Sequence, residues 1–346
     1  MTKQRGNGRL TRLIKWVGYL TAIFSLCGTL AAVAKYLYDR TERRKDVATL
    51  LATAVEEQKA SDYIASWQTL ERAVQLEPNS ARVRAAQEGL ALAWLEDVHL
   101  QESQKFSDVT EKLEPILERA VASGKPGSRE ADLRAHIGWI YFLESRDGRL
   151  DLDPIGPYRE AAKEDPDNPY AQAMWGHWIL WQNCEKIQEA KGHFAAALRS
   201  QRERDYVRRL EMLALLNCHN HQANLEVIRV ANAMREERGT PDDGTREHIL
   251  GIYYFEFTPK TAETSEFIHA VPPAEHVATF RWLFDSVRSD ANSRSSQAYY
   301  LAELEEAAGQ PDSAIINYRL ALRRLSRDST QGQAAYAGVK RLSRLQ

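Results

Sequence analysis

The sequence lacks the short motifs that usually mark an enzyme. It has no phosphate-binding loop of the P-loop type, no G-x-S-x-G, no H-E-x-x-H and no dinucleotide-binding glycine pattern. We therefore expect no enzyme, no catalytic residue, no cofactor and no small-molecule substrate. The alternating carboxylates of Asp147, Asp151 and Asp153 lack the spacing and the terminal Glu of a calcium loop, so we expect a solvated turn and no metal there.

Cysteine and net charge are also scarce. Three Cys in 346 residues exclude a scaffold built on disulfides, and Cys27 lies in an apolar N-terminal segment. The 46 basic and 48 acidic residues leave a net charge of -2, so no excess of positive charge indicates a nucleic-acid partner. The abundant residue types are Ala, Leu, Arg, Glu and Gln, and Gly and Pro fall mainly between the apolar stretches. This composition predicts an all-α protein.

One long uncharged run extends from Trp16 to Ala34. As a helix it would be about 28 Å long, close to the thickness of about 30 Å of a bilayer's hydrocarbon core. Aromatic residues near both ends suit the two membrane interfaces. We predict a transmembrane helix over 16–38, after a basic tail at 1–15 and before a charged juxtamembrane linker at 39–46.

The orientation of this helix rests on the basic residues around it. The tail carries Lys3, Arg5, Arg9, Arg12 and Lys15 without an acid, which favours a cytoplasmic N-terminus and an extracytoplasmic remainder. A second basic cluster follows the run, so a cytosol-facing membrane receptor stays an alternative. A further alternative is a signal peptide, because Ala32-Val33-Ala34 has the small residues that permit cleavage after Ala34 and release of a secreted or periplasmic module.

The remaining chain, 47–346, contains an internal repeat. Its clearest unit has a large and a small residue on one helix, a turn with Gly and Pro, and then small, aromatic and small residues on a second helix. These positions are Leu301, Ala302, Gly309, Pro311, Ala314, Tyr318 and Ala321. The same register recurs at Trp175, Gly176, Ile179, Ala190, Phe194 and Ala197, and in part at Ile137, Gly138 and Tyr141 and at Leu250, Gly251 and Tyr254. Small residues let paired helices approach, and large ones fill the space between neighbouring pairs.

This register resembles the tetratricopeptide repeat (TPR). The resemblance implies a solenoid of helical hairpins, with about seven helix pairs between 47 and 327 and a capping helix at 331–342. Ala73 with Pro78, and Ala161 with Pro166, resemble the helix endings of the family. The register is less regular in four places: 81–105 predicts an overlong helix, 147–157 is an insertion, 258–273 interrupts a pair, and 202–236 has Arg209 where an apolar residue is expected.

TPR proteins generally hold protein or peptide partners on a concave surface. Carried onto this chain, the family register exposes five ring-bearing side chains there: Trp139, Phe142, Tyr170, His177 and Trp181. Such side chains are suited to anchor a peptide or a partner helix. The alternative is that Trp139, Trp175, Trp178 and Trp181 are core residues between repeats. The chaperone-binding subclass uses a clamp of Lys, Asn and Arg, whereas Leu51, Val55, Ala173 and His177 occupy such positions here, which argues against co-chaperone activity.

Cys184 and Cys218 are one TPR period of 34 residues apart and would lie on the same edge of the solenoid. Neighbouring helical layers are about 8 to 10 Å apart, whereas a disulfide needs Cα atoms within about 7 Å. A disulfide, a metal site with His219 and His221, and two free thiols are all open readings. For the whole chain we expect a membrane-anchored TPR scaffold of the bacterial envelope. It would be single-pass in the inner membrane, with a periplasmic solenoid that binds proteins.

Overall fold

The computed structural model describes residues 7–98, 100, 104–124, 127–257, 262–284 and 291–344, with side chains from residue 33 onward except 291–293. In these ranges the chain is helical and has no strand. Its contacts divide it into two compact units, residues 1–98 and 99–346. This all-α architecture is the one that the composition predicts.

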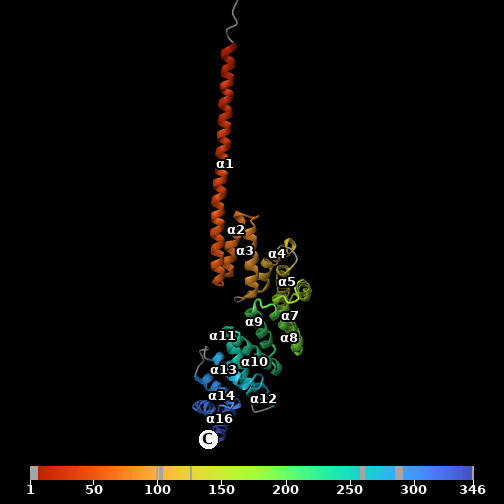
Figure 1. Cartoon of the computed structure of the whole chain (residues 1–346), viewed down its shortest axis with the longest axis vertical. Helices are drawn as coiled ribbons and strands as arrows, with labels where there is room; N and C mark the ends of the chain where they lie inside the picture. Colours follow the sequence, from red (N-terminus) through yellow and green to blue (C-terminus); the bar gives the residue numbers. More distant parts are fainter. Residues whose placement is uncertain are drawn as a thin grey trace, which may run out of the picture. The chain divides into compact units, whose positions relative to one another are not determined.

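Unit 1 consists of α1 (Asn7–Lys59), α2 (Tyr63–Leu76) and α3 (Ala81–Glu96), with α1 drawn in red in Figure 1. The C-terminal part of α1 pairs with α2. The Asp62 side chain caps α2 by accepting a hydrogen bond from the Ala65 amide, and the Ser66 hydroxyl donates to the Ala54 carbonyl oxygen. Apolar side chains of the three helices form two small core clusters, around Val47, Ala73 and Val83 and around Ala54, Leu70 and Leu90.

The predicted transmembrane segment 16–38 lies within α1, which continues without a break through the charged residues 39–46. The side chains of residues 1–32 lie outside the described part, and so does most of this prediction. Among the described residues, no helix is apolar over a length sufficient to cross a membrane. Val33, Tyr36, Leu37 and Tyr38, at the end of the segment, are about half exposed or more.

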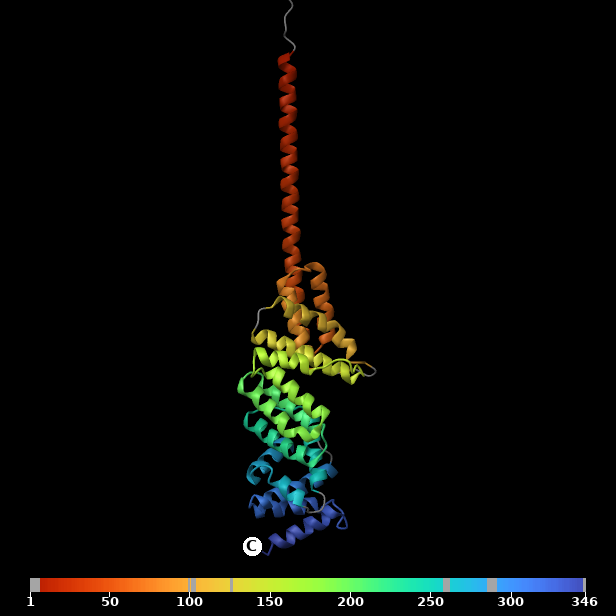
Figure 2. The same ribbon diagram turned by 90° about the vertical axis from the view of Figure 1, so that its right-hand side faces the viewer.

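Unit 2 continues with helices of ordinary length. They are α4 (Ser107–Ser123), α5 (Ser128–Arg146), α6 (Ile155–Glu164), α7 (Pro169–Gln182), α8 (Ile187–Arg199), α9 (Arg204–Leu216), α10 (His221–Glu236), α11 (Asp243–Glu256), α12 (Ala262–Ile268), α13 (Pro273–Phe284), α14 (Ala291–Ala307), α15 (Pro311–Ala321) and α16 (Thr330–Leu342). A short 3₁₀ turn, η1 (Cys184–Lys186), separates α7 from α8. Consecutive helices pair as α5/α6, α7/α8, α9/α10 and α14/α15, and α7 also packs on both α5 and α9. Figure 2 shows these hairpins stacked within unit 2, as in a helical solenoid.

Glycine explains the close approach of two of these pairs. A Cβ atom added to Gly138 on α5 would lie 2.5 Å from the Tyr158 ring of α6, and one added to Gly176 on α7 would lie 3.1 Å from the Phe194 ring of α8. Near the end of unit 2, Gly338 on α16 lies under the Tyr318 ring of α15 in the same way. The repeat register predicts the contact between Gly176 and Phe194, and the predicted capping helix corresponds to α16.

The register is wrong at α11. A Cβ atom added to Gly251 would meet nothing within 4 Å, so no aromatic ring covers this glycine. Tyr253 instead faces inward, where it is fully buried and its ring contacts Phe267 and Phe280. The extra helix α12, inside the predicted interruption at 258–273, contacts this inward side of the unit, and α11 packs only sparsely on α12 and α13. The helix is therefore rotated relative to the family register.

Two other stretches with an irregular register form ordinary helices in the structure. The predicted overlong helix 81–105 ends at Glu96 as α3. The weak stretch 202–236 still forms the hairpin α9/α10, because the buried Tyr206 supplies the apolar contact. The exposed Arg209 side chain covers the Tyr206 ring, with the guanidinium carbon 5.7 Å from the ring centroid.

Candidate protein-binding surface

The five predicted groove residues lie on two neighbouring helices. Trp139 and Phe142 belong to α5, and Tyr170, His177 and Trp181 belong to α7. Four of them are 8% exposed or less, whereas Trp181 is 44% exposed. Of the predicted set, only Trp181 thus offers a large accessible surface, and the other four differ from the exposed groove positions that the family register implies.

The four buried rings hold α5, α7 and α9 together. The Phe142 ring meets the rings of Trp139, His177 and Trp181 at centroid distances of 4.7, 5.0 and 5.5 Å. The Tyr170 ring lies 5.2 Å from the Tyr206 ring of α9. Tilted and edge-to-face arrangements of this kind are favourable for aromatic pairs. These four residues are therefore packed between helices. Of the alternative core set, Trp139 is buried, Trp175 and Trp178 are partly buried, and Trp181 is exposed.

His177 cannot act as a proton-exchanging group at neutral pH. Burial, and secondarily the nearby Arg146 charge, lower the pKa of its imidazole to about 3. Its Nδ1 atom is buried and has no hydrogen-bond partner. The ring is therefore a neutral packing element between Trp139 and Phe142.

Trp181 is part of a small exposed assembly at the C-terminal ends of α5 and α7. The Arg146 guanidinium carbon lies 5.2 Å from the Trp181 ring centroid and 4.7 Å from the Phe106 ring centroid. Partial burial lowers the Arg146 pKa from its ordinary value. A cation held between two aromatic faces is restricted in motion, and it orients the Trp181 ring at the surface. We call Phe106, Arg146 and Trp181 the Trp181 surface.

Cys184 and Cys218 form a disulfide in the structure, with their Cα atoms 5.5 Å apart. This is shorter than the layer spacing expected from sequence, because that spacing applies to helix axes and both cysteines lie in turns beyond helix ends. Cys184 begins η1 after α7, and Cys218 follows α9. His221, a member of the alternative metal site, has its Nδ1 atom 2.7 Å from Glu256 Oε2. Among the described residues, no group of three or more His, Cys, Asp or Glu side chains is placed to hold a metal ion.

A buried polar network that the sequence analysis missed links three successive hairpins. Asp132 on α5 accepts a hydrogen bond of 2.7 Å from Asn168 Nδ2, and Arg202 donates to its Oδ2 atom at 2.8 Å. Asn168 also caps α7 through the Ala171 amide. The spacing of about one repeat between Asp132, Asn168 and Arg202 is the signal that could have revealed this network.

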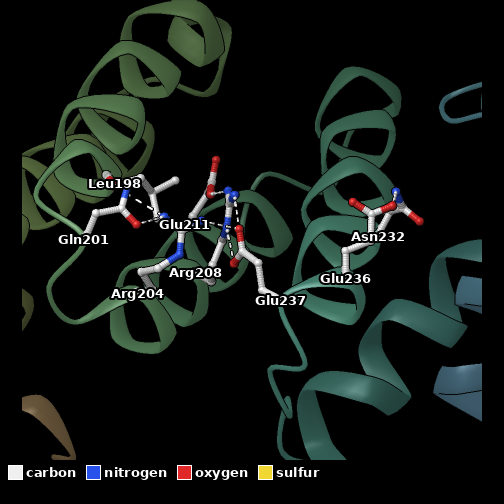
Figure 3. A network of polar contacts seen from close by, with 8 residues as sticks. All are labelled: Leu198, Gln201, Arg204, Arg208, Glu211, Asn232, Glu236 and Glu237. Carbon is white, nitrogen blue, oxygen red and sulfur yellow. Dashed lines mark hydrogen bonds and ion pairs between the residues drawn. The ribbon is translucent and has the colours of Figure 1, made fainter.

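A second network joins the start of α9 to the end of α10 (Figure 3). Arg208 donates to Glu211 at 2.9 Å and to Glu237 at 3.0 Å, and Arg204 also pairs with Glu237. Partial burial opposes ionisation of Glu237, but the hydrogen bonds from Arg208 and Arg204 outweigh it and lower the pKa of this carboxyl. Both arginines have carboxylate partners within the unit, so this cluster is a structural tie rather than an anion site.

Comparisons with known proteins give similarity in structure only. No protein-family model matches the chain, and no curated protein matches it. A solved tetratricopeptide repeat protein from Parabacteroides merdae is similar over 86% of this chain and 99% of its own, with 11% identity and a TM-score of 0.39. The Pseudomonas aeruginosa protein pilF matches over 85% and 98%, with 14% identity and a TM-score of 0.35. The TPR domain of P58(IPK) matches over 87% and 66%, with 15% identity and a TM-score of 0.29. At these low TM-scores, the assignment to a helical solenoid rests on the chain's own hairpins.

Proposed function

We propose that this chain is a non-catalytic scaffold that binds a protein or peptide partner through unit 2, and that α1 attaches it to a membrane. The observation that carries the binding role is the Trp181 surface. Trp181 leaves a large apolar area in contact with water, and a neighbouring cation holds its ring in place. Trp and Arg side chains are enriched where proteins bind one another. The Arg146 charge favours a partner segment that combines an apolar side chain with a carboxylate.

The test replaces Trp181 by Ala and compares partner capture from native membranes by crosslinking followed by affinity purification. The expected result is a loss of specific partners while the unfolding midpoint changes little, because Trp181 is the exposed member of its cluster. Leu150→Ala is the control, since Leu150 is 85% exposed and lies outside the Trp181 surface. Capture that is equal in all three proteins would exclude the Trp181 surface. Unfolding of the Trp181→Ala protein would instead indicate a purely structural role.

We propose further that residues 16–38 anchor the chain as a single-pass helix in a bacterial inner membrane. The uncharged run from Trp16 to Ala34 and the exposed apolar side chains at Val33, Tyr36 and Leu37 support this proposal. Alkaline extraction and mass spectrometry of the full-length protein test it. A membrane-retained, uncleaved chain is expected. A soluble product that begins at Lys35 would favour the alternative, a secreted or periplasmic module released by cleavage after Ala34.

The side of the membrane on which unit 2 lies is proposed to be extracytoplasmic. A disulfide between Cys184 and Cys218 persists in the oxidising periplasm and is rare in the cytosol, and the acid-free basic tail favours a cytoplasmic N-terminus. Protease added to intact spheroplasts should digest unit 2 but not a cytosolic control protein. Protection of unit 2, together with free Cys184 and Cys218 thiols in cells, would favour the cytosol-facing receptor.

A further inference from the structure

One face of α14 lines a partly open cavity of about 300 Å³ in unit 2. Arg294, Gln297, Ala298 and Leu301 recur every three or four residues, so they lie on the same face of this helix. The other described residues that line the cavity come from the end of α13 and from α15: Phe284, Asn317 and Leu320. We call this cavity the α14 pocket.

The apolar part of the lining is suited to a single side chain. It consists of Phe284, Ala298, Leu301 and Leu320, and Leu320 is 44% exposed. Sites for cofactors and drug-sized molecules have volumes of about 300 to 1,000 Å³, so the α14 pocket is at the lower limit of this range. One large apolar side chain with the adjoining backbone is an occupant of suitable size.

A hydrogen-bond acceptor of the α14 pocket has no donor within the described part of the chain. Gln297 Oε1 is buried, and no hydrogen-bond partner reaches it there. The amide of Asn317 is engaged elsewhere, because its Nδ2 atom donates to Glu305 Oε2 at 2.8 Å. A buried acceptor costs free energy until a donor pairs with it. A ligand with an N–H group would supply this donor.

The N–H group should be neutral. The lining contains no Asp or Glu among the described residues. The Glu305 carboxylate, which holds Asn317, also pairs with Arg281 at 2.6 Å, so its charge is already compensated. An ammonium group would therefore enter the pocket without a counter-charge, which burial disfavours, whereas a backbone amide would not.

The charge at the α14 pocket is positive. Arg294 is exposed, and within the described ranges no carboxylate pairs with it. It lies in the first turn of α14, where the helix dipole disfavours a cation, so local helix stability does not account for it. Because α14 and α15 form an antiparallel hairpin, the exposed Arg323 and Arg324, just after α15, lie toward the same end of the hairpin. These charges are complementary to a ligand with carboxylates.

We propose that the α14 pocket binds an acidic peptide segment of a partner protein. An apolar side chain of the segment fills the cavity, the backbone N–H of the same residue donates to Gln297 Oε1, and a neighbouring carboxylate pairs with Arg294. This site rests on the proposed function in one respect, that the ligand is a peptide, and it shares no helix with the Trp181 surface. Inorganic phosphate would satisfy the arginines without filling the apolar cavity.

The first experiment measures binding of a synthetic pentapeptide to the full-length protein in detergent by isothermal titration calorimetry. The peptide has one Leu between two Asp, and both of its ends are blocked. The wild type should bind it, and Arg294→Gln should raise the Kd about threefold or more, as expected for a partly exposed ion pair. Arg327→Gln is the matched control, because Arg327 is exposed and does not line the pocket. No binding to the wild type, or equal effects of the two substitutions, would overturn the proposal.

The second experiment tests the hydrogen bond to Gln297 Oε1 with a double-mutant cycle. Gln297→Met removes the acceptor, and N-methylation of the Leu in the peptide removes the donor. Each change alone should raise the Kd about threefold, and both together should raise it no further. Gln297→Met should not lower the unfolding midpoint, because it removes an unpaired buried acceptor. Effects of the two changes that multiply would show that this N–H and Oε1 do not meet, and would refute the proposed binding mode.

Two further titrations separate the α14 pocket from other sites. Inorganic phosphate at constant ionic strength should not displace the peptide, and full displacement would show that the arginines hold any anion. Trp181→Ala should bind the peptide with the same Kd as the wild type, so failure of the Trp181 surface and failure of the α14 pocket are distinguishable. Loss of peptide binding in Trp181→Ala would place the peptide on the Trp181 surface and overturn the assignment to the α14 pocket.

Discussion

A methyl group added to Gly138 would lie 2.5 Å from the Tyr158 ring and 3.1 Å from the Pro154 carbonyl oxygen. Because both neighbours belong to the packed start of α6, neither can yield without moving the hairpin. We predict that Gly138→Ala lowers the free energy of unfolding by about 1 to 3 kcal/mol, the range for overpacking a core. Urea unfolding measures this. As a control, Gly192→Ala should be neutral or stabilise by up to about 1 kcal/mol, since its site is open. Similar losses in both proteins would contradict the packing argument.

His221 should make the stability of the folded state depend on pH. Partial burial opposes its charge, but the hydrogen bond to Glu256 and the nearby Glu256 and Glu266 carboxylates outweigh burial and raise the pKa of the imidazole above its ordinary value of 6.5. The protonated ring therefore stabilises the folded state below pH 6.5, and this contribution is lost as the pH rises through the folded pKa.

We predict that His221→Gln changes the pH dependence of stability between pH 6 and pH 8. Because only the wild type loses the His221 contribution as the pH rises, its unfolding midpoint should gain less from pH 6 to pH 8 than that of the variant. His248→Gln, on an exposed position of α11, is the control and should follow the wild type. A variant whose pH profile parallels the wild type would show that the contacts with Glu256 and Glu266 do not couple to folding.

For single residues, the sequence predicted contacts that depend on the size of a side chain. The Gly176 and Phe194 contact follows from the repeat register, because a small residue and a ring at these positions fit only if the helices pair. The inward orientation of Tyr253 could not be predicted in the same way. Leu250, Gly251 and Tyr254 also match the register, and only the position of α12 and α13 decides which face of α11 is buried.

Between elements, the polar network around Asp132 connects α5, the start of α7 and the loop before α9. The carboxylate is 6% exposed and has partners in Asn168 and Arg202. We predict that Asp132→Ala costs about 1 to 3 kcal/mol, because it leaves the buried Asn168 amide without its acceptor, while the partly exposed Arg202 keeps a more distant partner in Asp165 at 3.8 Å. Asp167→Ala removes an exposed pair with Arg199 and should cost about 1 kcal/mol or less. Chemical denaturation of the two variants checks the contrast, which would vanish if the network contributed no more than a surface pair.

The disulfide joins the ends of α7 and α9. In oxidised protein it closes a loop with a sequence separation of 34 residues, for which loop-closure entropy predicts about 3 to 4 kcal/mol of stabilisation. Cys218→Ser should therefore lower the free energy of unfolding by roughly this amount relative to the oxidised wild type. In the presence of reductant the two proteins should unfold at nearly the same denaturant concentration. A difference that persists under reducing conditions would assign the effect to the substituted side chain instead of the bridge.

Sequence periodicity predicted the helices better than it predicted the turns and contacts between them. The capping helix α16 and the interruption that contains α12 were both predicted from the sequence. The approach of Cys184 and Cys218 was not, because a layer spacing taken from helix axes says nothing about turns that extend beyond them. For the same reason, the sequence could not decide which aromatic residues of α5 and α7 are exposed, since exposure depends on how α9 packs against α7.

For the whole molecule, the division at residue 98 was not predictable, because the repeat register continues through unit 1 and unit 2 with similar composition. The anchor and its orientation remain predictions from the uncharged run and the surrounding charges. The net charge of -2 leaves little overall repulsion between charged groups near neutral pH. The response of the molecule to acid should therefore depend on individual buried groups.

Two buried histidines of unit 2 should dominate that response. Burial lowers the pKa of His177 to about 3 and that of His276 to about 4, both below the ordinary value of 6.5. The Tyr253 hydroxyl hydrogen-bonds His276 Nε2, and the Ile268 carbonyl oxygen accepts from Nδ1, so both nitrogen atoms of the neutral ring have hydrogen-bond partners. As the pH falls from 6.5, the unfolded chain binds protons that the folded chain cannot, and stability is lost toward the folded pKa values.

Between pH 7.5 and 5 this linkage should destabilise unit 2 by about 2 kcal/mol for each of the two histidines. Urea unfolding at several pH values in this interval measures the slope before most carboxylates titrate. His276→Gln is expected to be less stable at pH 7.5 but to lose about half of the acid-dependent slope. The His221→Gln protein should show a steeper slope than the wild type, because His221 acts in the opposite direction. If the slope of the His276 variant equals that of the wild type, protonation of this buried ring is not what unfolds the protein in acid.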